Sequence, residues 1–314
     1  MTAKGKMMTL EQALKLVDGI YNDVPEEVYH AIPHFSASYA KDLIQNPALA
    51  QIEKESKKCF DIGSAVHALK LEGRDALNKR FAFLPGDAPK KPTALQKDAK
   101  KPSDSTLVAI EWWELFERAN AGKIIMTADD REIVEGCVKA IDAYPCVIQR
   151  GMFENGMNEV TIIYTDFETG IRCKSRIDSL SADGFVDDLK TAADTTVYGF
   201  TKAIAKLKYY LQAGAYFIAA NTVGIEINGV RLCGVCSKPP FQVIVGEFSE
   251  AYLNIGQMEY CRALNIEKEC RELGFYPNCS IPAHLPSLYE IYNPDGTVKA
   301  DDDVYEIWEV PAWL

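Results

Sequence analysis

The segment 176–190, RIDSLSADGFVDDLK, combines carboxylates with a lysine at a spacing that suits metal-assisted chemistry. From Glu159 onward the apolar pattern has a period of two, so FVDDLKT is predicted to be a β-strand. Asp188 and Lys190 then point to one face of that strand, whereas Asp187 points to the other. The alternation therefore selects Asp188 and Lys190 as a pair that can act together.

Two short turns are predicted to bring further carboxylates beside Asp188. A three-residue turn, 182–184, pairs Asp178 with Asp188 when the antiparallel register is counted outward. A four-residue turn, 167–170, pairs Glu159 with Asp178 in the same way. The sequence thus predicts that Glu159, Asp178 and Asp188 lie side by side on one face of three neighbouring strands, provided that no bulge shifts either register.

Such a row of acids requires positive charge nearby. Arg172, Lys174 and Arg176 share the predicted face and could supply it or contact substrate phosphates. A divalent cation is the other source: Mg²⁺, or Mn²⁺ in its place, takes hard oxygen ligands and keeps water for a phosphate substrate. Such an ion activates a water for phosphodiester cleavage, and Lys190 could orient that water. A solvated sheet edge is the alternative reading.

The elements that must position these residues form a mixed α/β layer architecture. Helices and loops come first, then an antiparallel meander, a helix of about 199–221, two more strands and a helix of about 249–273. We expect an N-terminal helical segment over 1–60, packed on a core over 61–314. A stretch rich in Pro and Lys, 85–106, is expected to be a loop or arm.

Composition limits the classes of protein that fit this sequence. The 314 residues are 47% hydrophobic and carry a net charge of −11, which argues against a simple basic nucleic-acid binder. Local lysine runs are either solvated faces or the lining of a basic channel. Without a long apolar run or an export signal, we expect no membrane contact and a cytoplasmic location. Cys233 and Cys236 have no matching second pair, so free thiols are favoured and no iron–sulfur cluster is expected.

The spacing of Asp178 from Asp188-Leu189-Lys190 resembles the core of the PD-(D/E)XK nucleases, in which a first Asp and a D/E-x-K lie on adjacent strands. The resemblance implies a restriction-endonuclease-like fold with a central mixed sheet. It also implies that the backbone carbonyl of Leu189 approaches the metal.

Two further motifs extend this resemblance to its RecB-like and RecE-like branch. The segment 63–73, GSAVHALKLEG, resembles a helix whose histidine is an additional metal ligand, here His67. Gln212 and Tyr216 resemble a Q-x-x-x-Y pair that flanks the scissile phosphate, and Lys208 is predicted on the same helix face. In the absence of these family motifs, a core histidine and a polar helix stripe would be the ordinary interpretations.

The most similar group is the C-terminal nuclease of exonuclease VIII (RecE), with lambda exonuclease more distant. This implies a processive 5′→3′ exonuclease on double-stranded DNA ends, in a bacterial cell or a phage-infected host, that leaves a 3′ single strand for an annealing protein. It also implies a ring of subunits, a tetramer in preference to a trimer. Arg172, Lys174, Arg176 and Lys208 are then candidate DNA contacts.

Three other functions stay open from the sequence alone. A RecB-like nuclease acting on single strands would need four cysteines framing the core. A non-catalytic module that binds DNA ends or a recombinase would be expected to lack a ligand, yet all the predicted ligands are present. An acidic interaction protein would carry the Asp178–Asp188 pair by accident.

Overall fold

A single six-stranded sheet lies at the centre of the protein, in the order β1-β4-β5-β6-β7-β8. The computed structural model describes residues 8–22, 24–52, 58–154, 156–279, 281 and 287–299. The β6–β7 pair is parallel and the other neighbours are antiparallel. This is the mixed α/β layer architecture that the sequence predicts. The strands are β1 (Gly19–Tyr21), β4 (Met157–Thr165), β5 (Arg172–Leu180), β6 (Phe185–Ala192), β7 (Gly229–Cys236) and β8 (Val243–Glu247).

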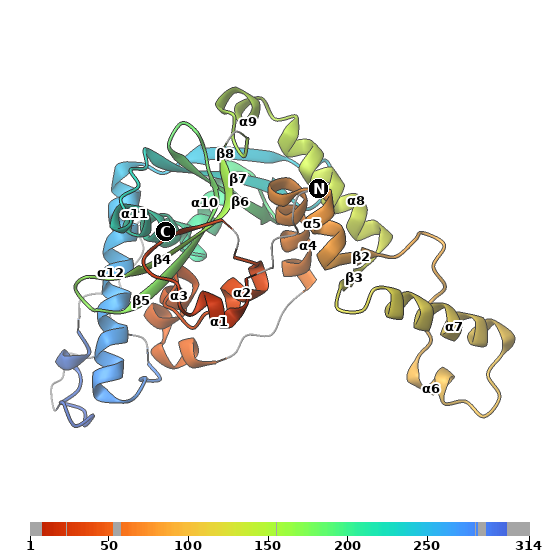
Figure 1. Ribbon diagram of the computed structural model, residues 1–314, viewed down its shortest axis with the longest axis horizontal. Helices are drawn as coiled ribbons and strands as arrows, with labels where there is room; N and C mark the ends of the chain where they lie inside the picture. Colours follow the sequence, from red (N-terminus) through yellow and green to blue (C-terminus); the bar gives the residue numbers. More distant parts are fainter. Residues whose placement is uncertain are drawn as a thin grey trace.

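Helices cover both faces of this sheet (Figure 1). Two layers are distinguished by their contacts, with α11 on β4 and β5, and α4 and α8 on β6 and β7. The helices are α1 (Leu10–Ala13), α2 (Glu26–Ala31), α3 (Ala37–Gln45), α4 (Lys58–His67), α5 (Arg74–Arg80), α6 (Ala94–Lys97), α7 (Asp104–Ala119), α8 (Ala128–Asp142), α9 (Pro145–Arg150), α10 (Val197–Lys206), α11 (Tyr209–Thr222) and α12 (Glu250–Leu273). A π-helical turn, Ala68–Glu72, continues α4, and 3₁₀ turns occupy Pro47–Gln51 and Leu288–Glu290.

The sheet separates the two larger apolar clusters of the interior, and a smaller third cluster joins the N-terminal segment to Ile163. Ile177 and Val186 belong to the cluster shared with α3, α11 and α12. Leu189 and Cys233 belong to the cluster shared with α4, α8 and the small parallel pair β2 (Phe81–Phe83) and β3 (Ile124–Met126). Burial of apolar side chains on both faces explains why the central strands are almost continuously buried.

The N-terminal segment adds a strand to the sheet as well as helices. The first helix, α1, ends at Ala13, and β1 pairs with β4 at the sheet edge. In the segment 85–106, the structure has the short helix α6 and the start of α7 where a loop or arm was expected. None of the helices within the described ranges is long and apolar enough to span a membrane.

Candidate active site

Three residues from three elements meet at one point beside the sheet. His67 ends α4, Glu159 lies on β4 and Asp178 lies on β5. One ligand atom from each lies within 4.8 Å of the other two, and Nδ1 of His67 is 3.6 Å from Oδ2 of Asp178. The backbone N–H of Leu189 donates to the same Asp178 oxygen at 2.9 Å. A nitrogen and two carboxylate oxygens at this separation can hold a divalent metal ion.

Asp188 and Lys190 form the neighbouring half of the site, on β6. Nζ of Lys190 lies 2.5 Å from Oδ2 of Asp188. The hydroxyl of Tyr216 on α11 donates to Oδ1 of Asp188 at 2.8 Å, and Nε2 of Gln212 donates to the Tyr216 oxygen at 2.7 Å. Helix α11 therefore fixes the orientation of Asp188. The predicted Gln212–Tyr216 pair does lie at the acidic cluster.

Both predicted strand registers occur, but the acids do not form one continuous row. The β4–β5 ladder skips the Glu159–Asp178 position, where Glu159 takes a φ of +56°. The β5–β6 ladder ends at the pair Ser179 and Asp187, one position before Asp178 and Asp188 would meet. A side chain with positive φ leaves the regular alternation. The three acids therefore meet where both ladders are interrupted and do not form one regular row across paired strands.

The electrostatics of the cluster reflect burial of like charges. Burial and the neighbouring Asp188 raise the pKa of Asp178 to about 7, against the opposing effects of Lys190 and the Leu189 N–H. Burial and Asp178 raise the pKa of Glu159 above its ordinary value. Two acids that resist ionisation together are a site where a bound cation would be favourable.

The pKa values of His67 and Lys190 shift in opposite directions at this site. Burial and the nearby Lys190 lower the pKa of His67, so its imidazole is neutral and able to coordinate a metal. Burial would lower the pKa of Lys190, but Asp188 and Asp178 raise it above its ordinary value. Lys190 therefore stays protonated as a hydrogen-bond donor at the site.

The three basic residues of β5 all contact the N-terminal segment. Lys174 is buried, and its ammonium group donates to the carbonyls of Tyr29 and Ile32, each at 2.7 Å. This structural role replaces the predicted DNA contact, because the group is not accessible to a DNA strand. Arg172 pairs with Asp18.

Arg176 is the one member of this trio at the acidic cluster. It pairs with Glu159 and donates to the carbonyl of Val24 at 2.9 Å. The guanidinium neutralises part of the acidic charge, as the sequence predicts for the arginines of this strand. Its contact with DNA stays a prediction.

The long helix predicted over 199–221 is broken in two, and this moves Lys208 away from the site. Helix α10 ends at Lys206, and α11 begins after Lys208, which has a φ of +49°. The Lys208 ammonium pairs with Glu259 of α12 at 2.7 Å. Lys208 is therefore not on the face shared by Gln212 and Tyr216, and that prediction is wrong.

Sequence reasoning missed two residues that complete the site. Lys41 on α3 donates to Oε1 of Gln212 at 3.3 Å. The ring of Tyr209 lies 5.3 Å from the Lys190 ammonium, in a cation–π arrangement. Tyr209 adjoins the Q-x-x-x-Y motif, but nothing in the spacing of Lys41 indicates that α3 reaches α11.

Asp187 and Arg231 form a separate buried cluster on the α4–α8 side of β6. Nη2 of Arg231 lies 3.0 Å from Asp187, and the same guanidinium contacts Asp183 at 2.8 Å. Ser181 donates to Asp187 as well. All these groups are mutually satisfied, so the cluster is structural. The alternation that separated Asp188 from Asp187 is confirmed.

The acidic cluster opens into a cavity of about 260 Å³. Helix α2 forms one wall, α4 forms the opposite wall, and Arg80 of α5 lies at the rim between Glu26 and Glu72. The site is therefore accessible from outside, although Asp178 and Asp188 are themselves buried.

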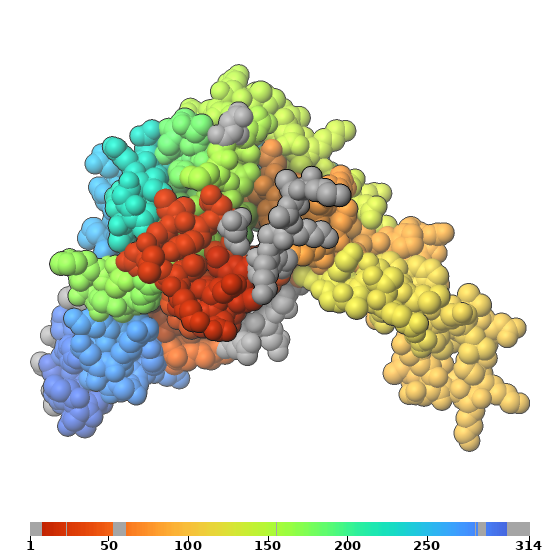
Figure 2. Space-filling view, in the orientation of Figure 1, coloured from red at the N-terminus to blue at the C-terminus, as the bar shows by residue number. Residues whose placement is uncertain are grey.

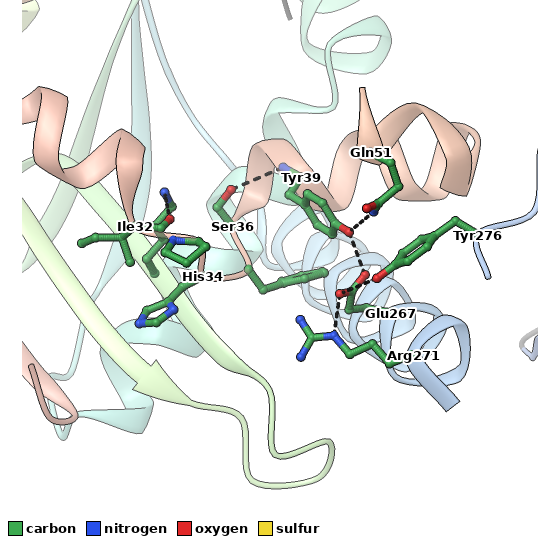
Figure 3. Close-up of a pocket in the computed structure, with 11 residues that line it drawn as sticks. Ile32, His34, Ser36, Tyr39, Gln51, Glu267, Arg271 and Tyr276 are labelled. Carbon is green, nitrogen blue, oxygen red and sulfur yellow. Dashed lines mark hydrogen bonds and ion pairs between the residues drawn. The ribbon is translucent and has the colours of Figure 1, made fainter. Parts of the chain in front are cut away.

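A larger cavity of about 440 Å³ lies nearby, between α3 and α12 (Figure 3). Its floor is Glu267, which accepts from Tyr39 at 2.9 Å, Tyr276 at 3.1 Å and Arg271 at 2.7 Å. These bonds join α3 to α12 and leave the carboxylate fully satisfied. We assign this network to structure, and the chemistry to the smaller cavity.

The family of the chain follows from its sequence. Residues 35–281 match the model of a family described as a PDDEXK-like domain of unknown function, DUF3799. The chain belongs to this family. No curated protein matches the sequence. The match covers every residue of the acidic cluster, so the resemblance found from the Asp178–Lys190 spacing is confirmed at the level of the nuclease superfamily.

Solved structures agree on the fold. A proposed exonuclease from Eubacterium rectale superimposes with a TM-score of 0.51 at 15% identity, over 80% of this chain and 86% of that one. A phage-related exonuclease from Haemophilus somnus gives a TM-score of 0.30 at 11% identity, over 59% and 91%. The first likeness shows a shared fold, and the PDDEXK-like assignment of that fold rests on the family match. The second likeness is too low to carry an argument. Family and fold together support a nuclease.

Proposed function

We propose that the protein is a magnesium-dependent DNA exonuclease. The observation that carries the proposal is the meeting of His67, Glu159 and Asp178 in one open cavity, beside the Asp188–Lys190 pair. In the structural Asp187–Arg231 cluster, the guanidinium contacts both carboxylates and holds the pKa of Asp183 below its ordinary value. Here the pKa values of Asp178 and Glu159 are raised instead, which favours a cation as the missing component.

The donor set fits a hard divalent ion. Asp178, Asp188, His67 and the Leu189 carbonyl would hold Mg²⁺ or Mn²⁺, and Glu159 would join them directly or through water. When bound, the metal supplies an activated water and stabilises the charge that develops on the phosphodiester. Within this set, the contact from the Leu189 N–H holds Asp178 in place.

The other residues of the site orient the reactants. The protonated Lys190 is held by Asp188 and positions the attacking water. Gln212 and Tyr216 keep Asp188 oriented from α11 and steady the substrate strand. Lys41 holds the far end of the Gln212 amide.

The kind of DNA end and the direction of digestion are proposed from the resemblance to the RecE-like group. We propose attack on double-stranded DNA ends in the 5′→3′ direction, leaving a 3′ single strand that an annealing protein would bind during recombination. A ring of subunits, a tetramer in preference to a trimer, would retain the DNA during processive digestion. The name of the Eubacterium rectale protein as an exonuclease supports the choice of ends over internal sites.

Digestion of end-labelled linear duplex with magnesium tests this function. We expect release of nucleotides from 5′-phosphorylated linear ends and no attack on a closed circle of the same sequence. If circles are degraded as fast as linear DNA, the requirement for DNA ends is wrong, although nuclease activity remains. Preference for single strands would favour the RecB-like alternative. Binding of ends without any cleavage, with Mg²⁺ or Mn²⁺, would favour the non-catalytic module.

A further inference from the structure

An arm with a basic tip projects from the body of the protein. It comprises residues 84–123, leaves the body after β2 and returns at β3, and contains α6 and α7. Figure 1 shows both helices beyond the edge of the layered body, and Figure 2 shows the arm projecting from it. The arm is not required to close either apolar cluster of the core, whose members end at Phe83 and resume at Met126.

The tip of the arm has the opposite charge to the chain as a whole. Residues 85–101 contain five lysines and two aspartates, a net charge of +3 against −11 for the whole chain. Among the described residues, no acidic group forms an ion pair with the exposed Lys90, Lys97, Lys100 or Lys101. The acids of α7 reduce the net charge of the whole arm to +1, so the excess of positive charge is confined to the tip, where it indicates a polyanionic partner.

Packing within the arm presents these lysines outward. The indole N–H of Trp113 on α7 donates to the carbonyl of Pro89 at 2.8 Å. Lys91 pairs with Glu117 at 2.6 Å and lies over the Trp113 ring at 5.0 Å. These contacts hold the chain before α6 against α7. The tip is thus a folded unit rather than a loose loop.

The arm begins at the rim of the active site. Arg80 lines the acidic cavity, and the next residue, Phe81, begins β2, from which the arm continues. Helix α7 has 16 residues, which corresponds to about 24 Å. Duplex DNA rises about 3.4 Å per base pair, so the arm can span about seven base pairs.

We propose that this arm binds the phosphate backbone of duplex DNA several base pairs away from the end held in the active site. The inference rests on the proposed function and adds a second contact to it. Lysine ammonium groups make phosphate contacts that are independent of sequence and sensitive to salt. The arm therefore increases affinity for long duplexes and does not take part in the chemistry.

The test compares the triple variant Lys97→Ala, Lys100→Ala, Lys101→Ala with a control that removes the same charge elsewhere. Lys139, Lys238 and Lys268 are exposed, lie outside the arm and form no ion pair with described residues, so their triple Ala variant is matched. Binding is measured in EDTA, to prevent metal-dependent cleavage, on duplexes of about 10 and about 40 base pairs over a range of salt.

We expect the arm variant to bind the long duplex at least about 10-fold more weakly, with a salt slope reduced by up to about 2.7 for three lost contacts. The short duplex and the control variant should be nearly unaffected. Equal losses in both variants, or on both duplexes, would overturn the proposal. An arm variant that changes the mass of the assembly in solution and leaves DNA binding intact would also overturn the proposal. The arm would then contact a second copy of the chain.

The outcome is separable from that of the proposed function. If binding depends on the arm but the protein cleaves nothing with magnesium, the proposed nuclease function is wrong and the arm proposal stands. If cleavage is normal but binding does not depend on the arm, the arm proposal is wrong and the nuclease function stands. A wild-type protein that does not bind duplex in EDTA would also overturn the arm proposal.

Discussion

Asp178 has the environment that most constrains the chemistry of the site. Its pKa of about 7 means that burial and Asp188 disfavour its charged form in the folded protein. The stabilising effect of the proton is fully present below the ordinary value of 3.8 and is lost as pH rises through 7. Without metal, the protein should therefore become less stable between about pH 4 and pH 8.

The first prediction follows from this loss of stability as the pH rises. Asp178→Asn should be more stable than wild type in EDTA at pH 8, by on the order of 2 kcal/mol, and the difference should vanish near pH 4. Urea denaturation at the two pH values measures it. Equal stability of both proteins at pH 8 would contradict the electrostatic account of the cluster.

The second prediction concerns the hydroxyl of Tyr216. Tyr216→Phe leaves Asp188 with the weaker Gln212 contact at 3.4 Å, so the carboxylate loses its fixed orientation. We expect a cleavage rate about 10-fold lower with unchanged affinity for duplex. Tyr210→Phe is the matched control, because its hydroxyl contacts Lys208 and Glu259 instead. A control that lost as much rate as Tyr216→Phe would argue against the orienting role.

Single residues show where sequence reasoning succeeds and fails. The choice of Asp188 over Asp187 needed only the period of two. Lys174 could not be placed, because its partners are carbonyls of Tyr29 and Ile32, about 140 residues away along the chain. Carbonyl groups carry no sequence signal, so a buried lysine and a DNA-binding lysine look alike.

At the scale of elements, the crossing of α11 over α12 positions Gln212 and Tyr216. A Cβ on Gly214 would lie 2.3 Å from the backbone of Gly256, and a Cβ on Gly256 would lie 2.0 Å from the carbonyl of Tyr210. Backbone atoms cannot move aside as a flexible side chain can. The two helices are therefore in contact only because both positions are glycine.

The third prediction is that Gly214→Ala destabilises the protein by about 3 kcal/mol and lowers cleavage together with stability. The displacement of α11 would move Tyr216 away from Asp188. Gly246→Ala is the control, since a Cβ there meets no atom within 4 Å. Thermal unfolding compares the two, and a Gly214→Ala protein as stable as Gly246→Ala would contradict the close crossing.

Strands and turns were predictable, whereas breaks in helices were not. Loop lengths of three and four residues were sufficient to give both hairpin registers. The break between α10 and α11 was missed because Lys208 adopts a left-handed conformation without a Gly or Pro to signal it. Glu159 is another non-glycine residue with positive φ, and it lies at one of the two places where the predicted row of acids is interrupted.

At the scale of the whole molecule, the site lies where separate layers meet. Helix α4 belongs to one face of the sheet, α11 to the other, and α2 and α3 close the cavity from the N-terminal segment. No short segment could have shown this convergence. Family motifs indicated part of it from the sequence because they mark positions on α4 and α11 as well as on the strands.

The distribution of charge is also a property of the whole chain. A net charge of −11 concealed both the basic tip of the arm and the arginine and lysines of the site. Sequence composition could only offer a basic channel or solvated faces as alternatives. The structure places the lysine-rich segment 85–101 on a projecting arm, which composition alone cannot do.

The most direct measurement of the central claim compares two adjacent aspartates of β6. Magnesium-dependent cleavage of linear duplex and thermal unfolding are measured for Asp188→Asn and Asp187→Asn. We predict that Asp188→Asn folds and loses at least about 100-fold in rate. Asp187→Asn should unfold at lower temperature, because Arg231 loses its buried partner, and should retain the wild-type rate per folded molecule. Full magnesium-dependent cleavage by Asp188→Asn would contradict the account.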